Sequence, residues 1–76
     1  MIAYMSRPAE RGFTSRAADV VRVEVIRVFL EEAHKPIYLW CFYNESVLTQ
    51  IEDVDSEGSA ALKLAAAHNW QLLGTS

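Results

Sequence analysis

The sequence has few of the residues that form cross-links and tight turns, with one cysteine, two prolines and three glycines in 76 residues. Because Cys41 is the only cysteine, no disulfide can form within the chain, and nothing favours an oxidising compartment. A nucleophile motif, a metal-ligand spacing and a glycine-rich phosphate loop are also missing. A chain of this length has little volume for a cleft. We therefore expect a protein that is not an enzyme and binds no cofactor.

Long apolar runs are absent as well. No run approaches the roughly 18 residues of a membrane-spanning helix, and the first residues, MIAYMSRPAERGF, lack the apolar core of a secretory signal. These absences predict a cytoplasmic protein with no membrane partner.

Positive charge is scarce, and the formal net charge is −3. Residues 1–18 carry three arginines against one glutamate, whereas residues 19–76 carry four basic and nine acidic groups. Aromatic side chains on a strand can stack on nucleic-acid bases, but affinity for the phosphate backbone needs clustered lysine and arginine. We therefore expect no direct nucleic-acid partner.

The composition is typical of a folded globular protein, with 51% hydrophobic and 22% charged residues. The length allows one domain. We predict a single domain over residues 17–76, preceded by an N-terminal arm at residues 1–16. The stretch SRPAERG within this arm is typical of a turn, and the sequence leaves open whether the arm is ordered.

Strand periodicity begins at residue 20, where valines alternate with Arg22 and Glu24. The alternation changes phase at Val25 and Ile26, as a one-residue bulge would produce. A helix over residues 17–34 is the alternative, but β-branched residues dominate the run and favour a strand ending near residue 30. A second strand is predicted over residues 37–43, since Pro36 suits the start of an edge strand.

A turn at residues 44–46 and a third strand over residues 47–54 complete an antiparallel meander. Asp55 or Ser56 can cap a helix that ends at Asn69, because the intervening residues have high helix propensity. Residues 70–74 are predicted as a short fourth strand. The predicted fold class is α+β, with a three- to four-stranded antiparallel sheet and one C-terminal helix packed on one face.

The second strand has apolar residues on both faces. In a strand Tyr38, Trp40 and Phe42 share one face, and the other carries a further apolar set: Ile37, Leu39, Cys41 and Tyr43. One helix can cover only one face. The N-terminal arm, a second copy of the chain or another partner can cover the other face. We expect a protein-protein interaction module, a homodimer whose interface is formed by Tyr38, Trp40 and Phe42.

Acidic residues gather between the third strand and the helix. Asp53, Asp55, Glu57 and Gly58 copy the opening of a calcium loop, but its closing glutamate is missing, so we predict no metal site. A clustered negative edge can instead occupy the basic groove of a nucleic-acid-handling protein. An inhibitor of phage or plasmid type, acting through Glu52, Asp53, Asp55 and Glu57, is therefore the alternative function. A binder of a small apolar ligand, held between sheet and helix, is a third.

Overall fold

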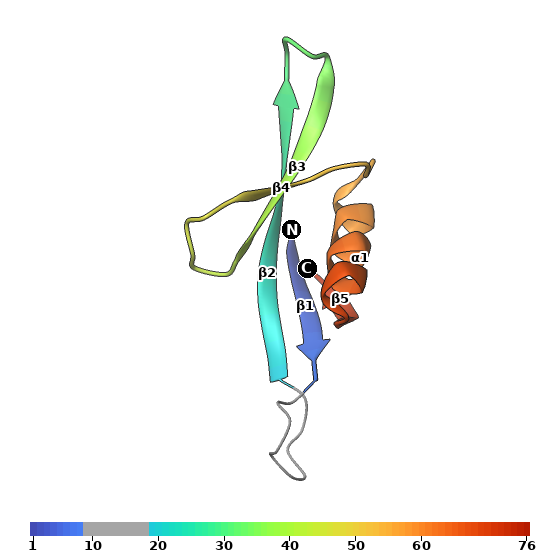
Figure 1. The fold of residues 1–76 in the computed structure, drawn as a ribbon. Coiled ribbons are helices and arrows are strands. Elements are labelled where there is room, and N and C mark those ends of the chain that lie inside the picture. The colour runs from blue at the N-terminus through green and yellow to red at the C-terminus, as the bar shows by residue number, and fades with distance from the viewer. Residues whose placement is uncertain (9–18) are drawn as a thin grey trace.

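The chain folds into a five-stranded antiparallel sheet with one helix near its C-terminus (Figure 1). The computed structural model describes residues 1–8 and 19–76. The strand order is β4-β3-β2-β1-β5. The elements are β1 (Ile2–Arg7), β2 (Asp19–Leu30), β3 (Lys35–Phe42), β4 (Thr49–Ile51), α1 (Glu57–His68) and β5 (Gln71–Thr75). The predicted α+β class is confirmed, with one strand more than expected.

Strands β2, β3 and β4 form the predicted antiparallel meander. The β2–β3 register runs without a break from Val23 opposite Phe42 to Leu30 opposite Lys35, so the bulge predicted at Val25 and Ile26 is wrong. The change of phase arises because β2 carries apolar side chains on both faces beyond Val25, and no extra residue is inserted. Residues 19–30 therefore form a strand, and the helix alternative is excluded for them.

Strand β1 comes from the segment predicted as an N-terminal arm. It lies between β2 and β5, and its register with β2 runs from Ile2 opposite Glu24 to Arg7 opposite Asp19. The sheet thus includes residues 2–7, and the domain begins earlier than the predicted boundary at residue 17. The rest of the predicted arm, residues 9–16, lies outside the described residues.

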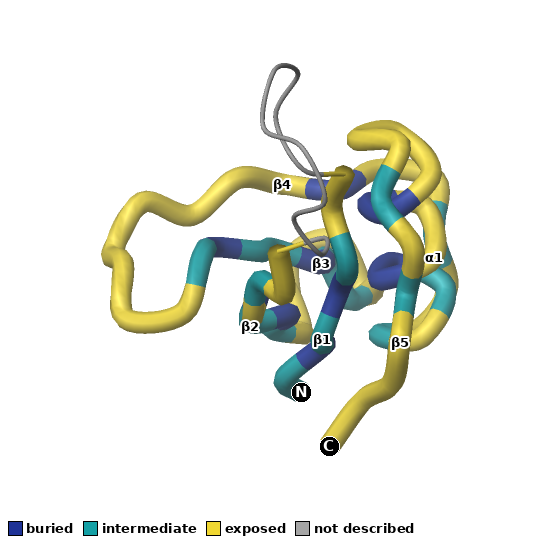
Figure 2. The backbone as a smooth tube through the Cα atoms, turned by 90° about the horizontal axis from the view of Figure 1, so that it is seen from below, coloured by how far each residue is buried: buried dark blue, intermediate teal, exposed yellow. Residues whose placement is uncertain are grey.

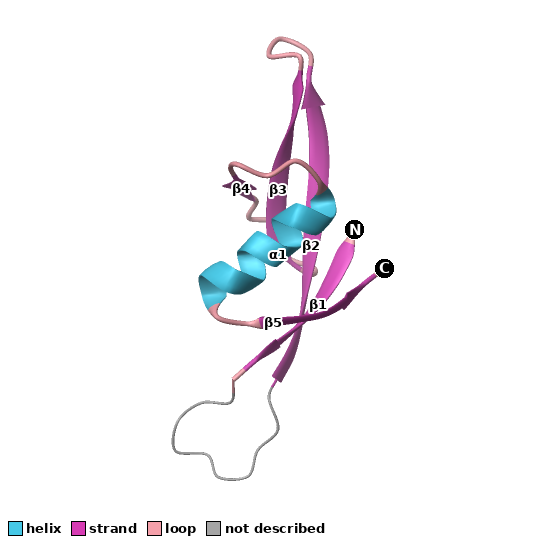
Figure 3. Cartoon of the chain, turned by 90° about the vertical axis from the view of Figure 1, so that its right-hand side faces the viewer, coloured by secondary structure: helices cyan, strands magenta, loops and turns pink. Residues whose placement is uncertain are grey.

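The helix begins and ends where the sequence predicts. The side chain of Ser56 accepts a hydrogen bond from the Ser59 N–H at 3.0 Å, and Asn69 ends the helix in the left-handed conformation with φ of 58°. Helix α1 connects β4, at one edge of the sheet, with β5 at the other, and so it crosses one face (Figure 3). Among the described residues, no helix has the length and apolar character of a membrane span.

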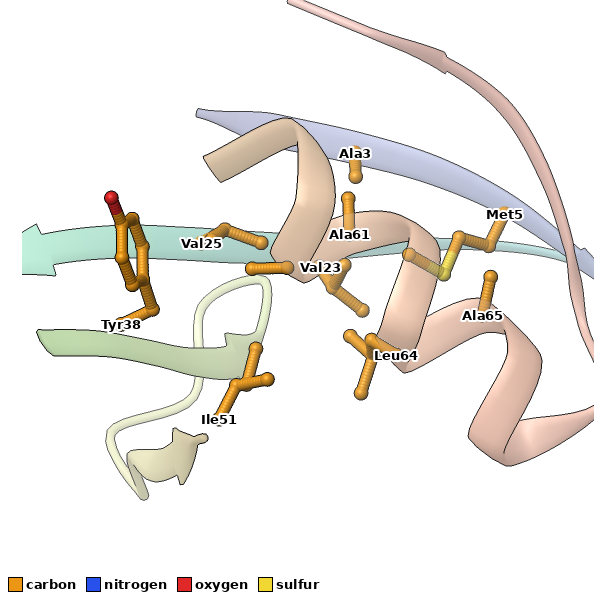
Figure 4. Packing of buried hydrophobic residues seen from close by; sticks show 10 residues of the cluster. Ala3, Met5, Val23, Val25, Tyr38, Ile51, Ala61, Leu64 and Ala65 are labelled. Carbon is orange, nitrogen blue, oxygen red and sulfur yellow. The ribbon is translucent and has the colours of Figure 1, made fainter. Parts of the chain in front are cut away.

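The core lies between this helix and the sheet (Figure 4). Figure 2 shows that buried positions occur on β1, β2, β3, β4 and α1, whereas β5 and the loops are mostly exposed. Small helix residues allow the helix to lie close to the sheet. The buried cluster consists of Ala3, Met5, Val23, Val25, Tyr38, Ile51, Ala60, Ala61, Leu64 and Ala65.

The molecule is elongated, with principal extents of 51 × 21 × 21 Å. Much of this length comes from the β2–β3 hairpin, which extends well beyond the end of α1 (Figures 1 and 3). Within the part of the chain that the structure describes, no helix lies over this part of the sheet (Figure 3).

Candidate functional site

The predicted interface residues Tyr38, Trp40 and Phe42 lie on the sheet face that carries α1. Tyr38 is 3% exposed and belongs to the buried cluster, while Trp40 and Phe42 are half-buried against it. Their cover is therefore provided largely within the chain. The exposed large apolar residues lie elsewhere in the molecule.

An aromatic cluster that the sequence analysis did not identify surrounds the C-terminal end of α1. The Trp40 ring meets Phe42 edge-on at 5.2 Å and His68 at 5.5 Å between centroids. Trp70 stacks on His68 at 4.4 Å. The His68 Nδ1 lies 3.0 Å from the Leu64 carbonyl oxygen. These contacts fix where α1 ends on the sheet, as expected for edge-to-face and stacked rings.

The acidic residues at the β4–α1 junction do not act as one group. Glu57 is half-buried, and its carboxylate lies 3.2 Å from the N-terminal ammonium of Met1. The other three, Glu52, Asp53 and Asp55, are exposed. No cluster of three or more His, Cys, Asp or Glu suited to a metal ion is found in residues 1–8 and 19–76. The inhibitor function stays a prediction, and its edge is reduced to the exposed acids.

The hollow between Trp40 and the end of α1 is the nearest approach to a pocket between sheet and helix. Its volume is about 360 Å³, and its lining is mixed, with the apolar side chains of Trp40, Ile51 and Leu64 beside the charged groups of Glu52 and Lys63. Sites for apolar ligands are lined mainly by apolar and aromatic groups. The charged groups in this lining do not favour an apolar ligand, and the apolar-ligand function stays a prediction.

Cys41 lies on the sheet face away from α1, opposite Glu24 of β2, and is 4% exposed. Burial raises the pKa of the Cys41 thiol, and the negative charges of Glu24 and Glu45 raise it further. A raised thiol pKa lowers the thiolate fraction at neutral pH, and the thiolate is the reactive form. This environment is that of a structural cysteine and not of a nucleophile.

Cys41 is expected to react with iodoacetamide at least about tenfold more slowly in the folded protein than in denaturant at pH 8. The folded-state rate should keep rising with pH after the unfolded thiol has levelled off, because the folded pKa is the higher one. Glu24→Gln should speed the folded-state reaction by removing a negative neighbour, and Glu31→Gln, in the exposed turn, is the matched control. Equal rates for these two variants would contradict the contribution assigned to the Glu24 charge.

Three neighbouring apolar residues are exposed at the end of the β2–β3 hairpin, residues 26–39, called here the projecting hairpin. Strand β1 accompanies β2 only as far as Val25, which pairs with Met1, and β4 accompanies β3 only over residues 38–40. Phe29, Leu30 and Val28 remain 52%, 39% and 37% exposed. Beyond these neighbours, no third strand of residues 1–8 or 19–76 flanks the hairpin, which continues there as a two-stranded ribbon.

Both faces of this ribbon are apolar. The register places Ile26 opposite Leu39 and Val28 opposite Ile37 on the face away from α1. Phe29 lies opposite Pro36 on the other face, which continues toward Tyr38. A two-stranded hairpin is only marginally stable alone in water, and contiguous apolar surface of this kind usually marks an interaction site.

The backbone of the hairpin also has an open edge. In an antiparallel ladder, alternate residues direct both N–H and C=O to the same side. Val25 exchanges both of its hydrogen bonds with Met1, at 2.8 and 2.9 Å, so Arg27 and Phe29 face that same side farther along β2. Within residues 1–8 and 19–76, no strand lies beside them there.

No protein-family model, curated protein or solved structure matches the chain. Function is therefore inferred from the surface of the molecule itself.

Proposed function

We propose that this protein is a protein-protein interaction module that associates with a second copy of itself through the projecting hairpin. One observation carries the proposal: the hairpin extends beyond the helix with apolar side chains on both faces, of which Phe29 is the most exposed. Natural sheets usually keep such a ribbon short, charged or covered. A second chain is the cover that we propose.

The energies favour a modest interaction. Burying a Val, Leu or Phe side chain fully is worth about 1.5–3 kcal/mol, and Val28, Phe29 and Leu30 are already about half covered. Covering the remaining exposed area of each of these three side chains contributes about 1 kcal/mol. The six side chains of a symmetric pair of hairpins therefore contribute about 6 kcal/mol. Association itself costs about 4–15 kcal/mol. Apolar cover alone is therefore marginal, and a stable dimer needs further contacts.

Charge favours a second copy over an unrelated partner. The hairpin carries Arg27 in its strand, and its turn carries Glu31 and Glu32. When two hairpins run antiparallel, the arginine of each approaches the acidic turn of the other. Opposite charges placed in this way set the orientation of an interface more than its affinity, and symmetric dimers are the commonest assembly.

Light scattering over a wide range of concentrations tests this proposal. The expected mass at high concentration is twice that of the 8.6 kDa chain. Val28→Lys should return the protein to a single-chain mass, because it places a charge in the proposed contact. Val47→Lys is the matched control, since Val47 is 75% exposed and lies in the β3–β4 loop. A single-chain mass for the wild type at every concentration would overturn the proposed function.

A further inference from the structure

We infer that two copies join edge to edge through β2, antiparallel and with Val28 on the two-fold axis. The inference rests on the proposed self-association and specifies its geometry. The partner is thus a second copy of this chain, and the contact is a strand-to-strand ladder that continues the sheet from one copy into the next.

The length of the open edge sets the register. Met1 occupies the position beside Val25, and β2 ends at Leu30, so no strand of the described residues lies beside residues 26–30 on that side. An antiparallel strand of the same residues fills this edge completely only when Val28 lies opposite its own copy. A register centred nearer to Val25 places the second strand where Met1 lies. A register centred nearer to Leu30 leaves the part of the edge next to Val25 unpaired.

This register satisfies the open backbone groups. Arg27 of each chain becomes hydrogen-bonded to Phe29 of the other, and each such pair exchanges two N–H···O bonds. These backbone hydrogen bonds add to the modest stabilisation that the apolar contacts provide. Backbone pairing and apolar cover therefore act together.

The side chains are also self-complementary in this register. On the face away from α1, Ile26 lies opposite Leu30 of the second copy, and the two Val28 side chains lie opposite each other. On the α1 face, Arg27 lies opposite Phe29 of the second copy and diagonal to Glu31 of that copy. Directly opposite and diagonal residues on one face interact, and an arginine over an aromatic ring is favourable.

The other edge of the hairpin is blocked. On β3, the backbone N–H and C=O groups of odd-numbered residues bond to β2, as the Tyr43 N–H does to the Arg22 carbonyl oxygen. The backbone groups of even-numbered residues, such as Tyr38, therefore point to the side of β4. Pro36 is also even-numbered, so its backbone lies on this outer side, and a proline has no N–H to offer to an added strand. A proline on this edge is a common protection against unwanted pairing. The β2 edge has no such protection in residues 26–30, and this difference selects it.

Cysteine cross-linking in a Cys41→Ala background tests the register. The Val28 pair is a non-hydrogen-bonded pair with Cα atoms about 4.5 Å apart, within the range of a disulfide. Val28→Cys should therefore give a covalent dimer under mild oxidation. Phe29→Cys is the control, because the thiols at position 29 would lie roughly 8 Å apart despite their greater exposure. We expect cross-linking at position 28 to be on the order of tenfold faster.

A backbone substitution provides a second test. Phe29→Pro removes an N–H that no strand of the described chain uses, whereas Phe29→Ala removes the side chain and keeps the N–H. Pairing through β2 predicts that the proline variant dimerises about tenfold more weakly than the alanine variant, with unchanged circular dichroism. A dimer that cross-links equally at both positions, or that tolerates the proline as well as the alanine, would overturn edge pairing and leave the proposed function standing. A monomer would overturn both.

Discussion

Met5→Asp is expected to leave the chain unfolded in buffer at room temperature. Met5 of β1 is 0% exposed, and its strand lies between β2 and β5. Truncating a buried methionine to alanine already costs about 2–5 kcal/mol. An unpaired carboxylate at the same place adds several kcal/mol of desolvation. Small domains are stable by about 5–15 kcal/mol, and this chain belongs to the size class at the lower end.

The matched control is Ser6→Asp, one residue along the same strand. Ser6 is half-buried and points to the face away from α1, so its substitution should leave a cooperative thermal transition. Circular dichroism melting curves of the two variants give the comparison. If Met5→Asp kept the wild-type melting curve, the central place of β1 in the sheet would be disproved.

Local signals gave the helix and the meander correctly. The helix was predictable because Ser56 and Asn69 supply an N-cap and a left-handed C-cap around a run of strong helix formers. The meander was predictable because β-branched and aromatic runs alternate with turn residues. Helix caps, turns and strand alternation depend on residues that are close together in the chain. For this reason they can be predicted from the sequence alone.

Features that depend on distant contacts were missed. Strand β1 spans only Ile2–Arg7, and both of its faces carry apolar residues, so period-2 alternation is weak there. The bulge prediction at Val25 failed for the same reason. Because β3 is apolar on both faces, the sequence does not determine which face α1 covers. That choice placed Tyr38 in the buried cluster.

Ala61→Leu is expected to lower the free energy of unfolding by about 1–3 kcal/mol, because the helix lies close to the sheet at this point. Ala61 is 0% exposed, and in Figure 4 its side chain points toward Ala3 of β1. The three added carbons of leucine have no space unless α1 moves outward and loosens the packing of its own buried residue Leu64 against Val23 and the rest of the sheet. Chemical denaturation of the two proteins measures the difference.

Ala67→Leu separates packing from helix propensity. Ala67 belongs to the same helix but is exposed, and alanine and leucine differ little in helix propensity, so its free energy of unfolding should stay within about 0.5 kcal/mol of the wild type. A loss at position 61 alone means that small side chains are required where α1 meets the sheet. Equal values at the two positions would mean that the helix has room to spare there. In that case α1 would pack only loosely on the sheet face that bears Tyr38, Trp40 and Phe42. These three residues would then again be candidates for the dimer interface.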